Sequence, residues 1–341
     1  MTRKLRRPLG LFCVCLVLGA LVDAYEAPTL GSRHRFTRVP HEVLAFYYPW
    51  YGRDGRHWRK IDAARHEISD STHYPVAGAY DSHDPTLIGS QIEMASRCGI
   101  TGFISSWWGQ GTFEDQAVPL LLKQAQKLGF KISVYWEDAK GKDAEQVDRA
   151  IGDLVYLVTQ YGRNPSFLKV DGKPVIFVYG RVVGEVPKQA WLAIVQGARA
   201  KAGDFLLIAE GYSEDHARTF DGMHAYNYAT AVERMRPEEI QKWATKNFSG
   251  DVNLARKFQC IACATVIPGY DDTKIRKPGD RVDRSNGQVY HALWEGALSS
   301  RPDWVLITSW NEWHEGSEIE PSLEYGNAYL RLTAEHTARF R

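Results

Sequence analysis

The residues best suited to chemistry lie close together near the C-terminal end of the sequence. The run ITSWNEWHEGSEIEPS, residues 307–322, places Asn311, Glu312, His314 and Glu315 within one short turn. Two carboxyl groups in one turn can flank one substrate bond, where one donates a proton and the other supports charge on the opposite side. This pair therefore predicts acid–base chemistry of the kind that cleaves sugar linkages.

Two tryptophans, Trp310 and Trp313, flank these acids and offer apolar surfaces. Such surfaces raise the pKa of a neighbouring carboxyl group, which helps one Glu to keep its proton near neutral pH. A solvated acidic turn is one alternative, although such a turn has no need of two tryptophans. A metal site with His314, Glu318 and Glu320 as further ligands is another, but the second histidine of a helical H-E-x-x-H motif is missing. We expect no metal and no other cofactor.

Alternating strand-like and helix-like segments precede this turn and must position it. Apolar runs predict strands over 43–48, 101–108, 130–137, 174–180, 205–211, 220–228, 258–269 and 304–310. Helical spacing predicts helices over 86–99, 117–129, 144–162, 187–201, about 237–247, 288–300 and from Asn327. Eight strands alternating with helices predict an α/β fold, a single-domain (β/α)8 barrel, because parallel strands need crossover helices. An open doubly wound sheet is the rival, but no glycine-rich phosphate loop follows any strand.

In such a barrel the chemistry lies where the strands end and the following loops begin. Six tryptophans fall at or just beyond these predicted strand ends, where we expect them to line a sugar-binding cleft: Trp50, Trp107, Trp108, Trp136, Trp310 and Trp313. The filling of a large core is the plainer interpretation of any single one of them.

Composition narrows the class of partner. The 341 residues are 44% hydrophobic and 24% charged, as in an ordinary globular protein. The formal net charge is +1 and the body of the chain has no basic cluster, which argues against a nucleic-acid partner. We expect a monomer. Cys98, Cys260 and Cys263 are an odd number and imply no disulfide framework. The spacing of Cys260 and Cys263 is also that of a redox or metal pair, but they lie in an apolar run and are predicted to be buried thiols.

The N-terminal residues have the pattern of a signal peptide. A basic start, an apolar stretch from Leu9 to Val22 and a small residue at Ala24 predict a signal over 1–24 and export of the protein to the periplasm or the medium. A signal anchor in the membrane is the alternative. Residues 25–42 would then form an N-terminal extension, and 43–341 the catalytic domain.

Several of these motifs resemble glycoside hydrolase family 99, the family of endo-α-1,2-mannosidases and endo-α-1,2-mannanases. The resemblance runs from about residue 44 to the C-terminus through AFYYPWYG (45–52), SWW (106–108), YWED (135–138), FDGMHAYNY (220–228), PGYDDTKIR (268–276) and, above all, TSWNEWHEGSEIEPS (308–322). It implies a (β/α)8 barrel, in agreement with the strand count.

The resemblance also implies roles for individual residues. Glu312 would act as a base on the 2-hydroxyl group of the sugar, which then attacks C1 to give a 1,2-anhydro sugar with net retention. Glu315 would protonate the leaving oxygen and later deprotonate water. The implied sugar ligands are Tyr47 or Tyr48, Glu137, Tyr226 and Tyr228, beside Trp310, Asn311 and His314 in the motif itself.

By this resemblance Trp108 forms a wall of the −2 subsite. Mannan-cleaving relatives have Trp at this position, whereas enzymes that cut glucosylated mannose have Tyr. The implied substrate is thus α-mannan or an N-glycan-type oligosaccharide. The chain departs from the family pattern in 52–78, which is shorter, and in the loop 108–116. A carbohydrate-binding or polysaccharide-biosynthesis protein without hydrolase activity, and a metal-dependent hydrolase, remain as alternatives.

Overall fold

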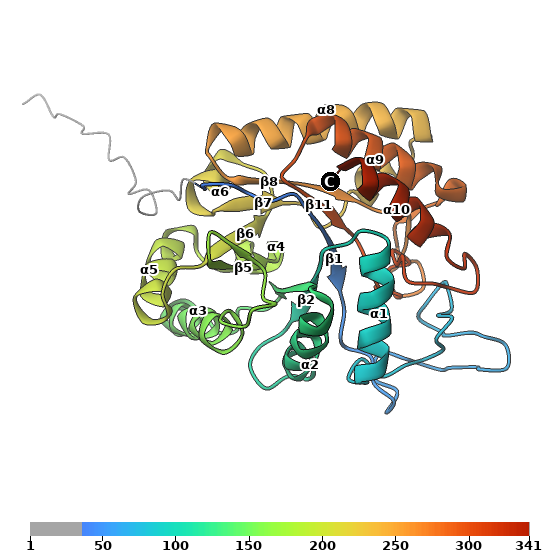
Figure 1. Cartoon of the computed structure of the whole chain (residues 1–341), viewed down its shortest axis with the longest axis horizontal. Helices are drawn as coiled ribbons and strands as arrows, with labels where there is room; N and C mark the ends of the chain where they lie inside the picture. The colour runs from blue at the N-terminus through green and yellow to red at the C-terminus, as the bar shows by residue number, and fades with distance from the viewer. Residues whose placement is uncertain (1–35, 341) are drawn as a thin grey trace, which may run out of the picture.

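Eight parallel strands close into a barrel in the computed structural model, which describes residues 36–340 (Figure 1). The strands pair in the order β3-β2-β1-β11-β8-β7-β6-β5, and pairing of β3 with β5 closes the ring. The closure confirms the predicted (β/α)8 barrel and excludes an open sheet. The barrel strands are β1 (Glu42–Tyr47), β2 (Gly102–Trp107), β3 (Lys131–Trp136), β5 (Lys173–Val178), β6 (Leu206–Glu210), β7 (Gly222–His224), β8 (Ile261–Val266) and β11 (Trp304–Ile307).

Helices surround this barrel, and the later ones pack together along one side of it (Figure 1). All seven predicted helices are present, but α8 runs ten residues past its predicted end. Three short helices, α4, α6 and α7, were not predicted. The helices are α1 (Pro85–Arg97), α2 (Phe113–Leu128), α3 (Asp143–Tyr156), α4 (Gly180–Glu185), α5 (Trp191–Ala202), α6 (Glu214–Thr219), α7 (Ala229–Val232), α8 (Pro237–Lys257), α9 (Gln288–Ser300) and α10 (Ala328–Phe340).

Three short strands lie outside the ring. β4 (Lys169–Val170) pairs antiparallel with β5. β9 (Tyr270–Asp271) and β10 (Arg281–Val282) pair with each other in the loop between β8 and α9. This small hairpin holds the segment that contains Arg276 over the end of the barrel.

The first barrel strand shows how the core is divided. Leu44 and Phe46 point into the barrel, where they join one apolar cluster, while Val43, Ala45 and Tyr47 join the layer between the barrel and the helices. Side chains alternate across a strand, so neighbouring residues must face opposite sides. This alternation decides which residues of the following loop can reach the inside of the barrel.

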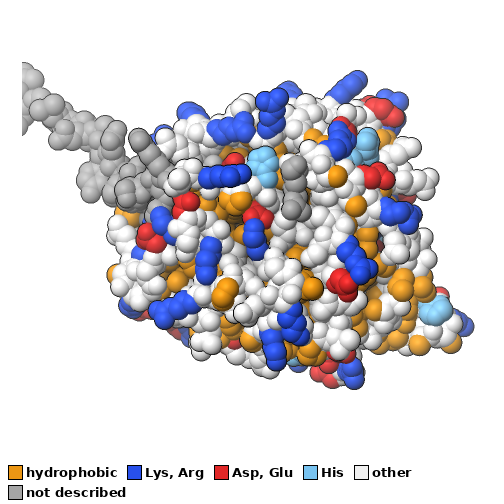
Figure 2. Space-filling view, in the orientation of Figure 1, with side chains coloured by type: hydrophobic (Ala, Val, Ile, Leu, Met, Phe, Trp, Pro, Cys, Tyr) orange, Lys and Arg blue, Asp and Glu red, His pale blue; other side chains and the backbone are white. Residues whose placement is uncertain are grey.

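The predicted signal, residues 1–24, lies outside the described residues, as does most of the predicted extension. Within residues 36–340 no helix has the length and apolar character needed to cross a membrane. On the face seen in Figure 2, Lys and Arg side chains are spread out with acidic side chains among them and do not form one basic field.

Candidate active site

Acidic and aromatic side chains from several loops meet at the carboxyl ends of the barrel strands. Glu312 and Glu315 follow β11, Glu137 follows β3, Tyr48 follows β1 and Tyr226 follows β7. The negative charges of the three glutamates all raise the pKa of the Tyr48 hydroxyl, after burial itself, and Tyr226 hydrogen-bonds to this hydroxyl. The five residues therefore form one cluster, at the end of the barrel where such folds place their chemistry.

Glu312 is buried in the turn after β11, with 2% of its surface exposed. Its Oε1 accepts a hydrogen bond from the backbone N–H of His314 at 3.1 Å, and its Oε2 has no partner. Burial raises the pKa of Glu312 well above the usual range, and the charge of Glu315 raises it further. A solvated acidic turn is thereby excluded, and the unpartnered oxygen is available to a ligand.

Glu315 lies in the same turn but has cationic and phenolic partners. Arg276 donates from both terminal nitrogens to Oε1 at 3.0 Å each, and the Tyr226 hydroxyl donates to Oε2 at 3.2 Å. Burial raises the pKa of Glu315, while the Arg276 guanidinium opposes this increase. The two acids of the turn thus have different surroundings, as expected of two carboxyl groups with different tasks.

Glu137 is a third acid of the cluster. Its side chain is buried, and Oε1 has no hydrogen-bond partner. Burial raises its pKa to about 8, against a hydrogen bond from Ser106 that lowers it. The group is therefore mostly protonated near neutral pH, and its unpartnered oxygen is available to a ligand.

Trp108 is partly exposed beside this cluster, as expected of a cleft wall. Its indole N–H donates to the Ser106 hydroxyl at 2.9 Å, and the Arg181 guanidinium lies 5.0 Å from its ring centre. Arg181 also donates to the backbone oxygen of Glu137 at 2.7 Å. A hollow of about 370 Å³ adjoins Trp108 and is lined by Asp138, Lys140 and other residues of the neighbouring loops.

A stack of aromatic rings borders the other side of Glu312. Trp50 stacks on His57 with ring centres 4.8 Å apart, and His314 Nε2 lies 2.8 Å from the backbone oxygen of His57. His314 Nδ1 is 3.5 Å from Glu312 Oε1. The shortened segment 52–78 therefore contributes to the site through His57.

Four expected sugar ligands lie elsewhere and must be corrected. Tyr47 is fully buried on the outer side of β1 and donates to Gln91 of α1 at 2.8 Å. Trp310 is fully buried in the same layer. Asn311 is also fully buried, where its amide group bonds to both the backbone N–H and the backbone oxygen of Tyr48. Asn311 therefore fixes the position of the loop after β1.

Tyr228 is the fourth expected sugar ligand that lies away from the acids. Its hydroxyl donates to Asp251 of α8 at 3.2 Å, and its ring packs against Trp243 and Phe248 of that helix. It therefore connects the loop after β7 to α8, and Tyr226 is the tyrosine of that loop that reaches the acids.

The predicted cluster of cleft tryptophans is largely wrong. Trp107, Trp136, Trp310 and Trp313 are all fully buried core residues. Only Trp50 and Trp108 of the six are partly exposed. The aromatic excess therefore mainly fills the core, which is the plainer interpretation that the sequence also allowed.

The remaining acids of the motif have structural partners and are not arranged around a metal. Glu318 forms ion pairs with Arg284 and His73 at 2.7 and 2.8 Å. Glu320 accepts hydrogen bonds from Gln91, Tyr80 and Trp313, and burial raises its pKa to about 7. These contacts fix the turn that contains Glu312 and Glu315.

The three cysteines of the described chain are buried, which confirms the predicted burial of Cys260 and Cys263. Two functional candidates were missed, Arg276 and Arg181. Arg276 stands in the run PGYDDTKIR, which was noted only as part of the resemblance. Its position after the seventh strand was the available signal, but only the β9–β10 hairpin brings it to Glu315.

Comparison with known proteins agrees with this geometry. Residues 25–332 match the sequence profile of Glycosyl hydrolase family 99. The chain belongs to this family. It is therefore a glycoside hydrolase, and the family's acids are to be sought in the cluster described above.

Relatives within the family are similar over most of the chain. A human glycoprotein endo-alpha-1,2-mannosidase-like protein is 31% identical over 84% of this chain and 70% of its own length. The rat glycoprotein endo-alpha-1,2-mannosidase is 28% identical over 82% of this chain and 68% of its own length. The solved structure of the family 99 endo-alpha-mannosidase from Bacteroides thetaiotaomicron is 27% identical and covers 88% of this chain and 97% of its own, with a TM-score of 0.73.

Proposed function

We propose that this protein is a retaining endo-α-1,2-mannosidase that cleaves α-mannan or a mannose-containing oligosaccharide. The observation that carries the proposal is a pair of acids, buried Glu312 and partly buried Glu315, in one turn at the carboxyl end of a family 99 barrel. The relatives named above are endo-α-mannosidases, which supports the substrate class.

In the proposed first step, the Glu312 carboxylate takes the proton of the sugar 2-hydroxyl and O2 attacks C1. The glycosidic C1–O bond breaks, and the leaving oxygen takes the proton of Glu315. The high pKa of Glu312 makes its ionised form a stronger base, and the raised pKa of Glu315 helps it to hold the proton it must donate.

In the second step, Glu315 takes a proton from water, and the resulting oxygen attacks C1 of the 1,2-anhydro sugar. The C1–O2 bond breaks, and O2 takes its proton back from Glu312. Both acids return to their starting states, and two inversions at C1 give net retention.

Glu137, Tyr48 and Tyr226 are proposed to contact the reacting sugar, since all three lie with the catalytic acids. Trp108 is proposed to be the wall of the −2 subsite and to favour mannose there over glucose. Arg181 would position this wall, since it contacts the ring and the loop of Glu137 together.

The test is incubation of the purified protein with α-1,2-linked manno-oligosaccharides and, in parallel, with glucosylated mannose. The products are measured by chromatography. We expect internal cleavage, with faster release of mannobiose than of glucosyl-mannose. Proton NMR of the first product should show the α-anomer. Lack of cleavage of either substrate would refute the activity, and a β-anomer would refute the retaining route alone.

We also propose that the protein is exported, because residues 1–24 have the basic, apolar and small-residue order of a signal peptide. The test is mass spectrometry of the N-terminus of the protein produced in its own host. Export with cleavage predicts a chain that begins at Tyr25, whereas an intact Met1 on a membrane-bound protein would support the signal anchor.

A further inference from the structure

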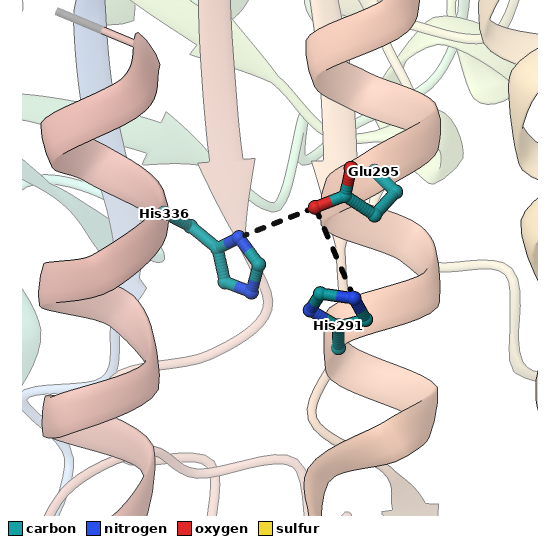
Figure 3. A group of neighbouring side chains, drawn as sticks. All are labelled: His291, Glu295 and His336. Carbon is teal, nitrogen blue, oxygen red and sulfur yellow. Dashed lines mark ion pairs between the residues drawn. The ribbon is translucent and has the colours of Figure 1, made fainter.

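Two histidines and a glutamate converge on the helical layer outside the barrel. His291 and Glu295 lie one turn apart on α9, and His336 faces them from α10 (Figure 3). Glu295 Oε1 is 3.9 Å from His291 Nε2 and 4.0 Å from His336 Nδ1. One ligand atom from each residue lies within 4.8 Å of the others. These helices stand apart from the strand-end loops that supply the proposed catalytic acids.

His336 is the unusual member of this group. It is 2% exposed, and neither ring nitrogen has a hydrogen-bond partner within the described chain. Its ring stacks on Trp294, with the ring planes 7° apart. Buried polar groups in proteins normally have a partner, so one is missing here.

We propose that His291, Glu295 and His336 bind a divalent transition-metal ion of the Zn²⁺ type that ties α10 to α9. Two imidazoles and one carboxylate suit Zn²⁺, whereas Ca²⁺ and Mg²⁺ prefer oxygen ligands alone. Bonds of about 2.0 Å place the ligand atoms of a tetrahedral site roughly 3.3 Å apart. The two Glu295 contacts are 3.9 and 4.0 Å, and no two of the ligand atoms are more than 4.8 Å apart, so the side chains must move inward to bind the ion.

Arg339 already contacts the carboxylate of Glu295 and must share it with the metal. Its Nη2 donates to Oε2 at 3.0 Å, while Nη1 contacts Oε1, the oxygen between the histidines. Arg339 is about half-exposed, so Nη1 can turn to solvent while Nη2 stays on Oε2. Such an outer contact is typical of carboxylates that bind metals, because it orients the oxygen that faces the ion.

The site joins the last helix of the barrel to the helix before it. A ligand that binds only the folded state stabilises that state by mass action. The role is structural and needs no part of the proposed catalytic chemistry. The proposed metal site can therefore be tested independently of the proposed function.

The experiment is titration of the chelator-treated protein with ZnCl₂, followed by calorimetry and by thermal unfolding. We expect one equivalent of Zn²⁺ to bind and the melting temperature to rise. His291→Ala and His336→Gln should each weaken binding about tenfold or more, since even supporting residues of metal sites have effects of this size.

His291 is largely exposed, so its alanine variant is expected to fold even if a change at buried His336 prevents folding. His66→Ala, at an exposed histidine in the loop between β1 and α1, is the matched control and should bind as the wild type does. Absence of binding by the wild type at submillimolar ZnCl₂, or equal binding by His291→Ala, would overturn the proposal.

Discussion

Glu312 and Glu315 are three residues apart, yet their surroundings differ in a way that fits the proposed division into base and acid. Glu312 is held by backbone contacts of its own turn and keeps one oxygen unpartnered. Glu315 is held by Arg276 and Tyr226, from loops after two other strands. The positive charge of Arg276 beside Glu315 therefore sets how readily Glu315 keeps its proton.

Removal of that cation should alter the pH profile in one direction. The Arg276 guanidinium lowers the pKa of Glu315, so Arg276→Gln should raise it. If Glu315 must be protonated to act, activity is lost as pH rises through this pKa. The alkaline limb of kcat/KM should therefore move to higher pH in the variant.

The measurement is the pH dependence of kcat/KM on an α-1,2-linked manno-oligosaccharide. Arg281→Gln, which removes an exposed guanidinium of the same loop that pairs with Asp271, is the matched control. A shift of the acidic limb instead would assign Glu315 as the base and contradict the proposed roles.

At the scale of elements, the two-residue alternation of side chains along strand β1 separates the residues that face the barrel interior from those that face the helices. Phe46 faces the barrel interior, so Tyr48 shares its side and Tyr47 faces the helices. The resemblance left Tyr47 and Tyr48 as alternatives, although the two-residue alternation of the strand already separates them.

This alternation gives a paired prediction. Tyr47→Phe removes a buried hydrogen bond to Gln91, so we expect a loss of about 1–2 kcal/mol of unfolding free energy and activity within twofold of the wild type. Tyr48→Phe should change stability less but lower kcat/KM about tenfold or more, because its hydroxyl lies among the acids. Urea unfolding and initial rates check both, and the reverse pattern would place Tyr47 in the cleft.

The barrel strands could be predicted because most are short apolar runs between turn residues. β7 is the exception, since only Gly222–His224 of the predicted 220–228 forms a strand. The end of α8 was missed because Ser249 and Gly250 resemble a stop signal. The helix continues because Phe248, Val252 and Ala255 keep its buried face continuous. Arg276, by contrast, reaches Glu315 only through a hairpin fold that no local pattern specifies.

At the scale of the whole molecule, the aromatic residues mainly stabilise the barrel. Seven tryptophans are among the largest fully buried side chains, and four of them had been assigned to the cleft from their place at strand ends. A residue at a strand end still alternates between the barrel interior and the helical layer, so position along the chain alone does not predict exposure.

Buried acids also set how the stability of the fold depends on pH. Glu137 and Glu320 have pKa values of about 8 and about 7, against 4.5 for a free glutamate. Between pH 4.5 and these values each of the two acids holds a proton more often in the folded state than in the unfolded chain, so its contribution to stability falls as pH rises. Burial lowers the pKa of His57 and of His336 to about 4, and these groups act in the opposite sense up to about pH 6.5, so we expect the net decline in stability from about pH 6.5 to 8. Each group adds a slope of at most about 1.4 kcal/mol per pH unit.

Glu137→Gln removes one such group and should flatten this decline, as measured by urea unfolding at several pH values. Glu93→Gln, at an exposed acid on α1, is the control and should leave the slope unchanged. An equal slope in Glu137→Gln and the wild type would mean that Glu137 ionises at its ordinary pKa in the folded protein.

The most direct test of the central claim is the initial rate of Glu312→Gln and of Glu315→Gln on an α-1,2-linked manno-oligosaccharide. We predict that each variant lowers kcat about 10²- to 10⁴-fold while substrate binding, measured by calorimetry, stays within several-fold of the wild type. Glu335→Gln, at an exposed acid on α10, should keep the wild-type rate. Near-normal turnover by either active-site variant would contradict the account.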